Sequence, residues 1–199
     1  MKEFFLCLFS FLFGSIPFGF LICKHRLGVD IRKIGSGNIG TTNVIRVAGP
    51  LWGIIVLVLD ASKGLIPVLV AKSLSFTPLF IVLAGIFSIL GHIFSPFVGL
   101  RGGRGVATGL GVVSGIAPQI ALYLFLVWLV VVLITRYVSL ASLTSAFLFP
   151  IFMAITHQDL PYFLISIVIS ILVIIRHKPN IERLLKGEEQ KIGKRVKLQ

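Results

Sequence analysis

Long apolar segments, separated by short polar and basic stretches, make up most of this sequence. A helix needs about 20 apolar residues to cross a hydrocarbon core of roughly 30 Å. Segments near that length cover residues 4–23, 51–70 and 78–98, and shorter, almost uncharged ones cover residues 119–135, 140–156 and 160–175. A seventh, residues 106–116, holds three glycines and could be a short helix or a re-entrant segment; we count it as a helix. The pattern predicts an all-α, polytopic membrane protein with seven transmembrane helices.

The composition agrees with a membrane protein. Of the 199 residues 56% are apolar, and the mean hydropathy is +1.02, above what a soluble domain with a polar surface carries. The first apolar segment has no small-residue cleavage site after it, so we expect a retained helix instead of a signal peptide. We expect one transmembrane domain over residues 1–199, in which residues 178–199 form a basic, partly amphipathic cytoplasmic tail.

The distribution of basic residues gives the expected orientation. Of the 19 Lys and Arg residues, only Lys2, Lys63 and Lys72 lie outside one set of alternate loops and the C-terminal tail. Cytoplasmic loops are enriched in Lys and Arg, so seven spans place the N-terminus outside and the C-terminus in the cytoplasm. Nucleic-acid binding is disfavoured, because no soluble domain presents the charge and few aromatic residues interleave with it. Topology and attraction to anionic lipid head groups account for most of the positive charge.

The first basic loop contains the densest group of polar residues, in the stretch GSGNIGTTNVIRVAG at residues 35–49. Glycines let backbone amides approach a ligand, and hydroxyl and amide side chains add donors, which together suit a phosphate group. A Gly-rich polar turn without a ligand is the alternative. Gly35, Gly37 and Gly40 match the spacing G-x-G-x-x-G, but no βαβ unit flanks them, which excludes a dinucleotide-binding motif.

Two further polar clusters are expected on the same side of the membrane. In the stretch GLRGGRGVATGLG at residues 99–111, Arg101 and Arg104 precede a helix whose N-terminus favours an anion, although such arginines also serve as helix-end anchors. The third cluster combines RYVSLAS at residues 136–142 with HKPNIERLLKGEE at residues 177–189. The amphipathic pattern of the latter predicts a helix that lies along the membrane surface.

Few charged or titratable residues remain outside these clusters. Asp60 and Lys63 are spaced for a pair within one helix; we expect a structural ion pair and keep Lys63 as a second-tier site residue. His25 and Asp30 have the H-x4-D spacing of acyl-CoA-dependent glycerolipid acyltransferases, but no partner motif accompanies them. His157 is expected at the surface of an outer loop. Metal-ligand sets, a Walker A loop and a G-x-S-x-G elbow are all missing, so we expect no metal and no cofactor.

The polar clusters resemble the bacterial acyl-phosphate:glycerol-3-phosphate acyltransferase family. The matching stretches are SGNIGTTNVIRVAG from Ser36, GHIFSPFVGLRGGRGVATG from Gly91 and HKPNIERLLKGEE from His177, and the shorter DASKG and RYVSLAS match as well. Their order and spacing agree over nearly the whole chain. The resemblance implies a seven-helix protein of the bacterial cytoplasmic (inner) membrane, with its site near the cytoplasmic face. It also implies transfer of a fatty acyl group from acyl phosphate to glycerol 3-phosphate, which yields lysophosphatidic acid and phosphate.

The resemblance, together with the polar clusters, implies two groups of site residues. Those expected to take part in catalysis are Ser36, Arg46, His92, Arg104, Ser142, His177 and Asn180. Those expected to bind substrate are Gly37, Asn38, Gly40, Asn43, Lys63, Gly102, Gly103, Gly105 and Ser139. Arg46 and Arg104 would hold phosphate, the two serines would donate hydrogen bonds, and Asn180 with His177 would orient the glycerol hydroxyls. The family usually has Lys where this chain has Arg104, so a planar guanidinium replaces a point charge.

The chemistry of such a reaction fits these residues. Acyl phosphate is an activated mixed anhydride, so no covalent enzyme intermediate is needed, and positioning and charge stabilisation are the main tasks. Either a histidine or a substrate phosphate could take the hydroxyl proton. The expected partners are glycerol 3-phosphate, acyl phosphate, membrane lipids and the enzyme that supplies acyl phosphate, and no nucleic acid. A transporter of a phosphorylated solute is the alternative, and it would require a pathway through the membrane midplane.

Overall fold

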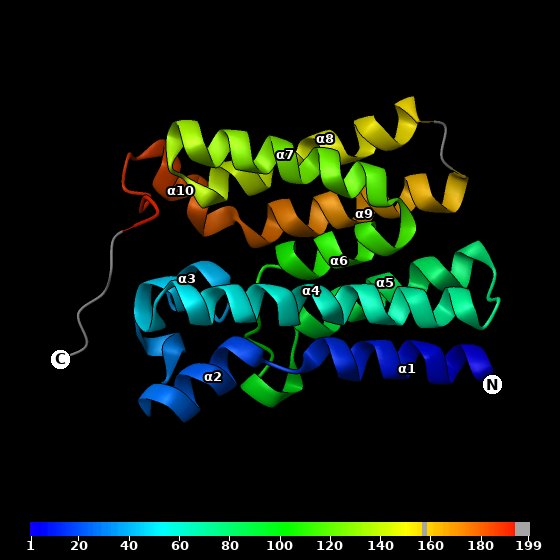
Figure 1. Cartoon of the computed structure of the whole chain (residues 1–199), viewed down its shortest axis with the longest axis horizontal. Coiled ribbons are helices and arrows are strands. Elements are labelled where there is room, and N and C mark those ends of the chain that lie inside the picture. The colour runs from blue at the N-terminus through cyan, green and yellow to red at the C-terminus, as the bar shows by residue number, and fades with distance from the viewer. Residues whose placement is uncertain (157–158, 194–199) are drawn as a thin grey trace.

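The computed structural model describes residues 1–156 and 159–193, and all regular structure in this part of the chain is helical (Figure 1). His157 and the last residues of the basic tail lie outside the described residues. The α-helices are α1 (Lys2–Ser15), α2 (Phe18–Leu27), α3 (Thr41–Ala48), α4 (Pro50–Ser73), α5 (Pro78–Ile93), α6 (Val106–Ile116), α7 (Pro118–Thr135), α8 (Val138–Ile155), α9 (Leu160–Arg176) and α10 (Lys178–Leu185). Two short 3-10 helices are η1 (Ile31–Lys33) and η2 (Pro96–Val98).

Each of the seven expected apolar segments is helical, but not all are long enough to span a membrane. Within the described residues five helical segments are long and apolar enough to cross: Lys2–Leu27, Pro50–Ser73, Pro78–Val98, Pro118–Thr135 and Val138–Ile155. A sixth is formed if α9 and α10, which are bent by 58° at their junction, count as one. Helix α6 has 11 residues and is about 16 Å long, half the thickness of the hydrocarbon core.

Two local features differ from the expectation. The first apolar segment is not one continuous helix, because α1 ends at Ser15 and α2 begins at Phe18. Pro17 explains the break, since it has no N–H to donate to a helical carbonyl. The second half of the Gly-rich stretch at residues 35–49 is helix α3, whereas the sequence indicated a loop throughout.

Close packing at glycines fixes how the central helices cross. A Cβ atom at Gly64 of α4 would collide with the carbonyl oxygen of Thr108 on α6, and one at Gly111 of α6 would collide with that of Ala61 on α4. Helix backbones can therefore approach to a distance that any larger residue would forbid, which is a common way to pack helices in membranes. This crossing holds the start of α6 beside the middle of α4.

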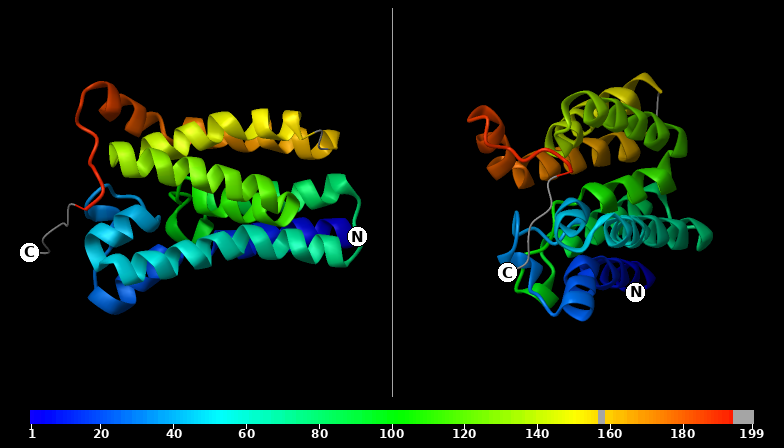
Figure 2. Two further views of the ribbon diagram at one scale, coloured as in Figure 1. Left: turned by 45° about the horizontal axis from the view of Figure 1, so that its top comes forward. Right: turned by 60° about the vertical axis from the view of Figure 1, so that its left-hand side comes forward.

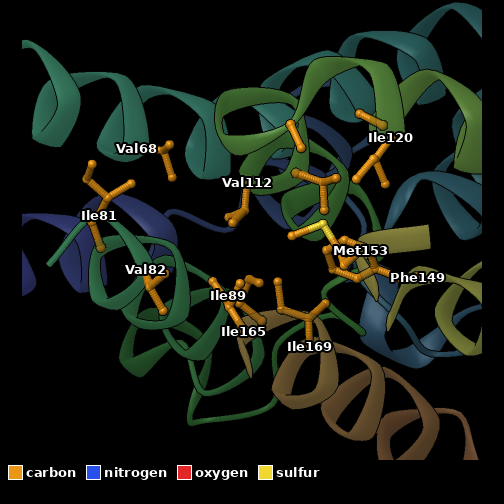
Figure 3. Close-up of a cluster of buried hydrophobic side chains, with 14 of the residues drawn as sticks. Val68, Ile81, Val82, Ile89, Val112, Ile120, Phe149, Met153, Ile165 and Ile169 are labelled. Atoms are coloured by element: carbon orange, nitrogen blue, oxygen red, sulfur yellow. The ribbon is translucent and has the colours of Figure 1, made fainter. Parts of the chain in front are cut away.

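The long helices run side by side, and the polar segments gather at one end of the bundle (Figure 1). This end, formed by α3, α10 and residues 187–193, is called the site end below. Two further views show the segment after α10 running along this end beside α3 (Figure 2). Away from it the interior is an apolar core that includes Val112, Phe149, Met153 and Ile165 (Figure 3).

Candidate active site

A cavity of about 410 Å³ lies at the site end, between α3, α4 and α6 on one side and α7, α8, α9 and α10 on the other. Its outer part is polar and carries most of the basic and hydroxyl side chains, whereas its inner part is lined by apolar residues such as Leu110 and Ile169. A volume of this size is typical of sites for small ligands. The cavity therefore suits a ligand with a polar head and an apolar chain.

The apolar part of the cavity has a floor. The deepest lining residue of each helix is Val113 on α6, Leu124 on α7, Phe149 on α8 and Ile169 on α9. About one turn further along their helices, Ile120, Met153 and Ile165 belong to the packed core and do not line the cavity. Figure 3 shows Phe149 and Met153 together in this core. The cavity therefore ends within the bundle.

Most of the residues expected from the sequence come together around this cavity. Those that line it are Ser36, Asn38, Gly40, Asn43, Arg46, His92, Arg104, Gly105, Ser139, Ser142, His177 and Asn180. The remaining four, Gly37, Lys63, Gly102 and Gly103, lie behind the lining. They support the residues in front of them: Gly102 and Gly103 donate backbone hydrogen bonds to the carbonyls of Ile93 (3.0 Å) and His92 (3.1 Å).

The Gly-rich stretch is folded around the side chain of Asn43. Its Nδ2 donates to the carbonyl oxygens of Asn38 (2.9 Å) and Ile34 (3.0 Å), and its Oδ1 accepts from the backbone N–H of Ser36 (3.0 Å). Asn38 Oδ1 in turn accepts from the backbone N–H of Gly40 at 2.7 Å. The two asparagines thus shape the loop that leads into α3, so the whole amide of Asn43 and Oδ1 of Asn38 are already used within the protein.

Four polar atoms in the cavity lining are buried without a hydrogen-bond partner among the described residues. One, Asp60 Oδ1, lies in an ion pair with Lys63; the other three are Thr41 Oγ1, Arg46 Nε and Asn180 Oδ1. Buried polar atoms in proteins nearly always have a hydrogen-bond partner, so several unpartnered atoms around one cavity indicate where a polar ligand binds. Thr41, at the N-terminus of α3, was not among the residues selected from the sequence, although it lies in the Gly-rich stretch.

Positive charge dominates the polar part of the cavity. Burial lowers the pKa of Arg46 below its ordinary value. The pKa of Arg104 falls to about 10, first because of burial and then because neighbouring arginines repel its charge, although Glu189 offsets part of this effect. The guanidinium of Arg46 donates to the carbonyl oxygen of Gln190 at 3.0 Å. An anion bound here would relieve the repulsion between the arginines.

Glu189 supplies a carboxylate at the site, and sequence reasoning missed it. It accepts hydrogen bonds from Ser139 Oγ (2.7 Å) and Asn180 Nδ2 (2.6 Å) through Oε1, and from Arg183 Nε (2.7 Å) through Oε2. Burial alone would raise its pKa, but these hydrogen bonds outweigh burial and hold the pKa below its ordinary value. Arg183 was missed too. Both residues belong to the stretch HKPNIERLLKGEE, and their place in this family-like stretch was the sequence feature that could have indicated them.

His177 is held in one protonation state. Its Nδ1 lies 2.8 Å from the carbonyl oxygen of Val173, an atom that can only accept, so Nδ1 carries the proton and Nε2 has a lone pair. Burial, followed by the charge of Arg104, lowers the pKa of His177 to about 4. The ring is therefore neutral at pH 7 and can accept a hydrogen bond from a hydroxyl group.

The hydroxyl of Ser142 has partners within the bundle. It donates to the carbonyl oxygen of Val138 (2.9 Å) and accepts from Trp128 Nε1 (3.2 Å). Ser139 donates to Glu189, as described above. To donate to a substrate, the hydroxyl of Ser139 or Ser142 would have to leave its present acceptor. In Ser36 it is the backbone N–H that is engaged, by Asn43 Oδ1.

Comparisons with known proteins agree with this geometry. Residues 4–187 match the family model described as glycerol-3-phosphate acyltransferase. The glycerol-3-phosphate acyltransferase of Aquifex aeolicus (strain VF5) is 46% identical over 192 residues, which cover 96% of this chain and 100% of that protein. That of Fusobacterium nucleatum is 44% identical, with 96% and 98% covered.

Solved structures give the same result. The crystal structure of PlsY (YgiH), an integral membrane glycerol 3-phosphate acyltransferase in its glycerol 3-phosphate form, superposes with a TM-score of 0.93 at 45% identity, covering 97% of this chain and 96% of that one. The lysophosphatidic acid form of PlsY gives a TM-score of 0.91 at 44% identity, with 98% and 97% covered.

Proposed function

This chain belongs to the glycerol-3-phosphate acyltransferase family, and we propose that the acyl donor it uses is acyl phosphate. It is an integral membrane enzyme of phospholipid synthesis that acylates glycerol 3-phosphate, and lysophosphatidic acid is the product. The donor, the roles of single residues and the side of the membrane on which the site lies are the parts that we propose.

The amphipathic cavity is the observation that carries this proposal. Its polar part places Arg46 and Arg104 beside unpartnered donor and acceptor atoms, and its apolar part ends at a floor of aliphatic and aromatic side chains. An acyl phosphate has the same two parts, a phosphate and an alkyl chain joined at the reacting carbonyl. The phosphate is compact enough to contact the arginines directly. Because acyl phosphate is already an activated anhydride, the phosphate can leave the acyl carbon without further activation by the enzyme.

In the proposed reaction the two arginines and the N-terminal end of α3 hold the phosphate of the donor. The hydroxyl oxygen of glycerol 3-phosphate forms a bond to the acyl carbon, and the bond from that carbon to the phosphate oxygen breaks. The electron pair leaves with the phosphate, whose increasing charge the guanidinium groups stabilise. His177 Nε2 accepts the hydrogen bond of the attacking hydroxyl, and Asn180 Oδ1 accepts one from another hydroxyl of glycerol. The hydroxyl proton leaves with the phosphate product in the overall balance.

A transporter is disfavoured by the shape of the cavity. Transport needs alternating access from both faces, usually around a site near the midplane. Here the cavity ends at Phe149 and its neighbours, and the next turn of each helix is closely packed core. Its wall does reach the lipid-facing surface, since Phe125 lines the cavity and is 40% exposed. A cavity that is closed inward and reaches the lipid-facing side suits an enzyme with a lipid substrate.

We further propose that all seven apolar helices lie in the membrane, with the N-terminus outside and the site end in the cytoplasm of a bacterial inner membrane. The basic loops and tail support this orientation. An alkaline-phosphatase fusion after Gln199 should be inactive, because that end would be cytoplasmic, whereas a fusion after Ser75 should be active. The reverse result would contradict the orientation and with it the cytoplasmic site.

The donor is tested with purified protein in lipid vesicles, supplied with radiolabelled glycerol 3-phosphate and either acyl phosphate or acyl-CoA. We expect labelled lysophosphatidic acid from acyl phosphate alone. Product from acyl-CoA at an equal rate would contradict the proposed donor. The next question would then be whether the expected partner, a separate enzyme in the same membrane, supplies the acyl phosphate.

A further inference from the structure

A buried lysine stands behind the cavity and contacts one of its histidines. Lys63 on α4 is 1% exposed, and its Nζ lies 2.7 Å from Asp60 Oδ1 in an ion pair. The same nitrogen donates to the carbonyl oxygen of Ile16 at 2.8 Å, in the break between α1 and α2, and lies 3.0 Å from His92 Nδ1. Charged groups within membrane helices are costly, so this arrangement requires a reason.

The contacts of Lys63 determine the protonation of His92. An ammonium group has three donors and no acceptor. Asp60, Ile16 and His92 give it one acceptor each, so His92 Nδ1 must present its lone pair to Lys63. A neutral imidazole with a lone pair at Nδ1 carries its proton at Nε2. A second proton on Nδ1 would face the ammonium directly and is excluded by repulsion.

The Nε2 edge of His92 faces the loop that leads to Arg104. A Cβ atom at position 103 would collide with Nε2, so only glycine allows this approach. The backbone N–H of Gly103 also donates to the His92 carbonyl, which fixes the loop against the ring. His92 lines the cavity, whereas Lys63 lies behind it. The protonated nitrogen therefore lies against Gly103, the residue before Arg104 in the chain.

We propose that Lys63 is a positioning residue that holds His92 as its Nε2–H tautomer, so that His92 donates a hydrogen bond to a phosphate oxygen beside Arg104. Asp60 keeps Lys63 protonated in this role, because its carboxylate pairs with the ammonium. The proposal rests on the proposed function only for the identity of the anion. It assigns His92 the role of a donor and excludes it as the base, which leaves His177 as the histidine with a free lone pair in the cavity.

The tautomer is measured directly by nitrogen NMR of protein labelled with ¹⁵N-histidine in detergent micelles. We expect the His92 signals to show a protonated Nε2 and an unprotonated Nδ1 at neutral pH, with their assignment made by comparison with His92→Gln. A protonated Nδ1 on His92 would overturn the proposal, whatever the enzyme proves to catalyse. Failure of the acyl phosphate assay would instead overturn the donor and leave this result intact.

The positioning role is tested with a double variant, Asp60→Asn with Lys63→Met, which avoids leaving one buried charge unpaired. Lys72→Met, at the other end of α4, is the matched control. We expect the double variant to fold, to show both tautomers of His92 and to lose on the order of 10- to 100-fold in kcat, somewhat less than a preorganised donor contributes. An unchanged His92 spectrum in this variant would overturn the role of Lys63.

Substitutions of His92 itself separate a donor from a base. The amide nitrogen of Gln can reach the position of Nε2, whereas that of Asn reaches the position of Nδ1. We expect His92→Gln to retain at least 10-fold more activity than His92→Asn, because an amide can donate but cannot take a proton. Equal and complete loss in both folded variants would show that His92 acts as a base and would overturn the proposal.

Discussion

Replacement of Arg104 by Gln should weaken catalysis while it leaves the fold as stable as before, or makes it more stable. The pKa of Arg104 falls from its ordinary value to about 10, chiefly through burial, with repulsion by neighbouring arginines adding to it and Glu189 offsetting part. At 1.36 kcal/mol per pKa unit, keeping this group charged in the folded protein costs about 3 kcal/mol. The sign follows from the lowered pKa: the cost is present at every pH below about 10 and decreases above it.

A bound phosphate changes this balance, because its charge offsets the repulsion among the arginines. Arg104→Gln removes the repelled charge and with it the interaction with phosphate. Loss of one preorganised donor costs on the order of 100- to 1000-fold in kcat, or about 3 kcal/mol. Arg104→Lys keeps the charge and introduces the residue that the family resemblance leads us to expect, so it should stay active. Arg101→Gln in the same loop is the control, because Arg101 is exposed and does not line the cavity.

The assay combines two measurements on matched, monodisperse preparations. Thermal unfolding in detergent reports stability, and release of phosphate from acyl phosphate reports turnover. We expect Arg104→Gln to unfold at the same temperature as the wild type or higher, and to gain less stability from added phosphate. Turnover near that of the wild type would show that Arg104 is only a helix-end anchor. A lower unfolding temperature would refute the argument from burial.

The remaining predictions concern the tail, the donor and the metal requirement. The pKa of Glu189 is lowered, so its stabilising contribution is present at neutral pH and is lost as the pH falls through that lowered value; Glu189→Gln should unfold at a lower temperature at pH 7 and should show a weaker decrease in acid than the wild type. His25→Ala and Asp30→Ala should leave turnover within about 10-fold, and a loss of about 1000-fold, roughly 4 kcal/mol, would support an acyl-CoA enzyme instead. Addition of EDTA should leave activity unchanged, and recovery of lost activity with Mg²⁺ would contradict this. Short- and long-chain acyl phosphates should react at similar rates when compared at equal mole fraction in vesicles.

The positions of the helices could be predicted because segment length and hydropathy are local properties. The apolar segment at residues 106–116 forms α6 with the same bounds, and the segment at residues 78–98 matches one candidate span. The break between α1 and α2 could not be predicted in this way, because it depends on a distant residue. The carbonyl oxygen of Ile16, which lies in the break, accepts a hydrogen bond from Lys63 on α4. A proline indicates that a break can occur, but only a tertiary partner allows it inside a membrane.

The site was predicted unevenly for a similar reason. Motif residues such as Arg46 and His177 line the cavity because each motif lies at one end of its helix. Glu189 could not be derived from its own segment, where it appears as one of three acidic residues in a basic tail. Its partners Ser139 and Asn180 come from α8 and α10, so its burial depends on contacts between segments far apart in the sequence. Spacing along the chain carries no information on such contacts.

The two parts of the cavity should contribute differently to binding of the proposed donor, and we expect the arginines to contribute more than the floor. A buried CH₂ group gains about 0.8 kcal/mol on leaving water. An acyl chain that arrives from the bilayer is already in hydrocarbon, so the apolar wall formed by residues such as Leu124 and Phe149 offers it little further gain. The phosphate, by contrast, exchanges the membrane interface for Arg46 and Arg104 in a partly buried site, where each ionic interaction is stronger. Discrimination between donors should therefore come from the head group, and chain length should have a small effect on rate.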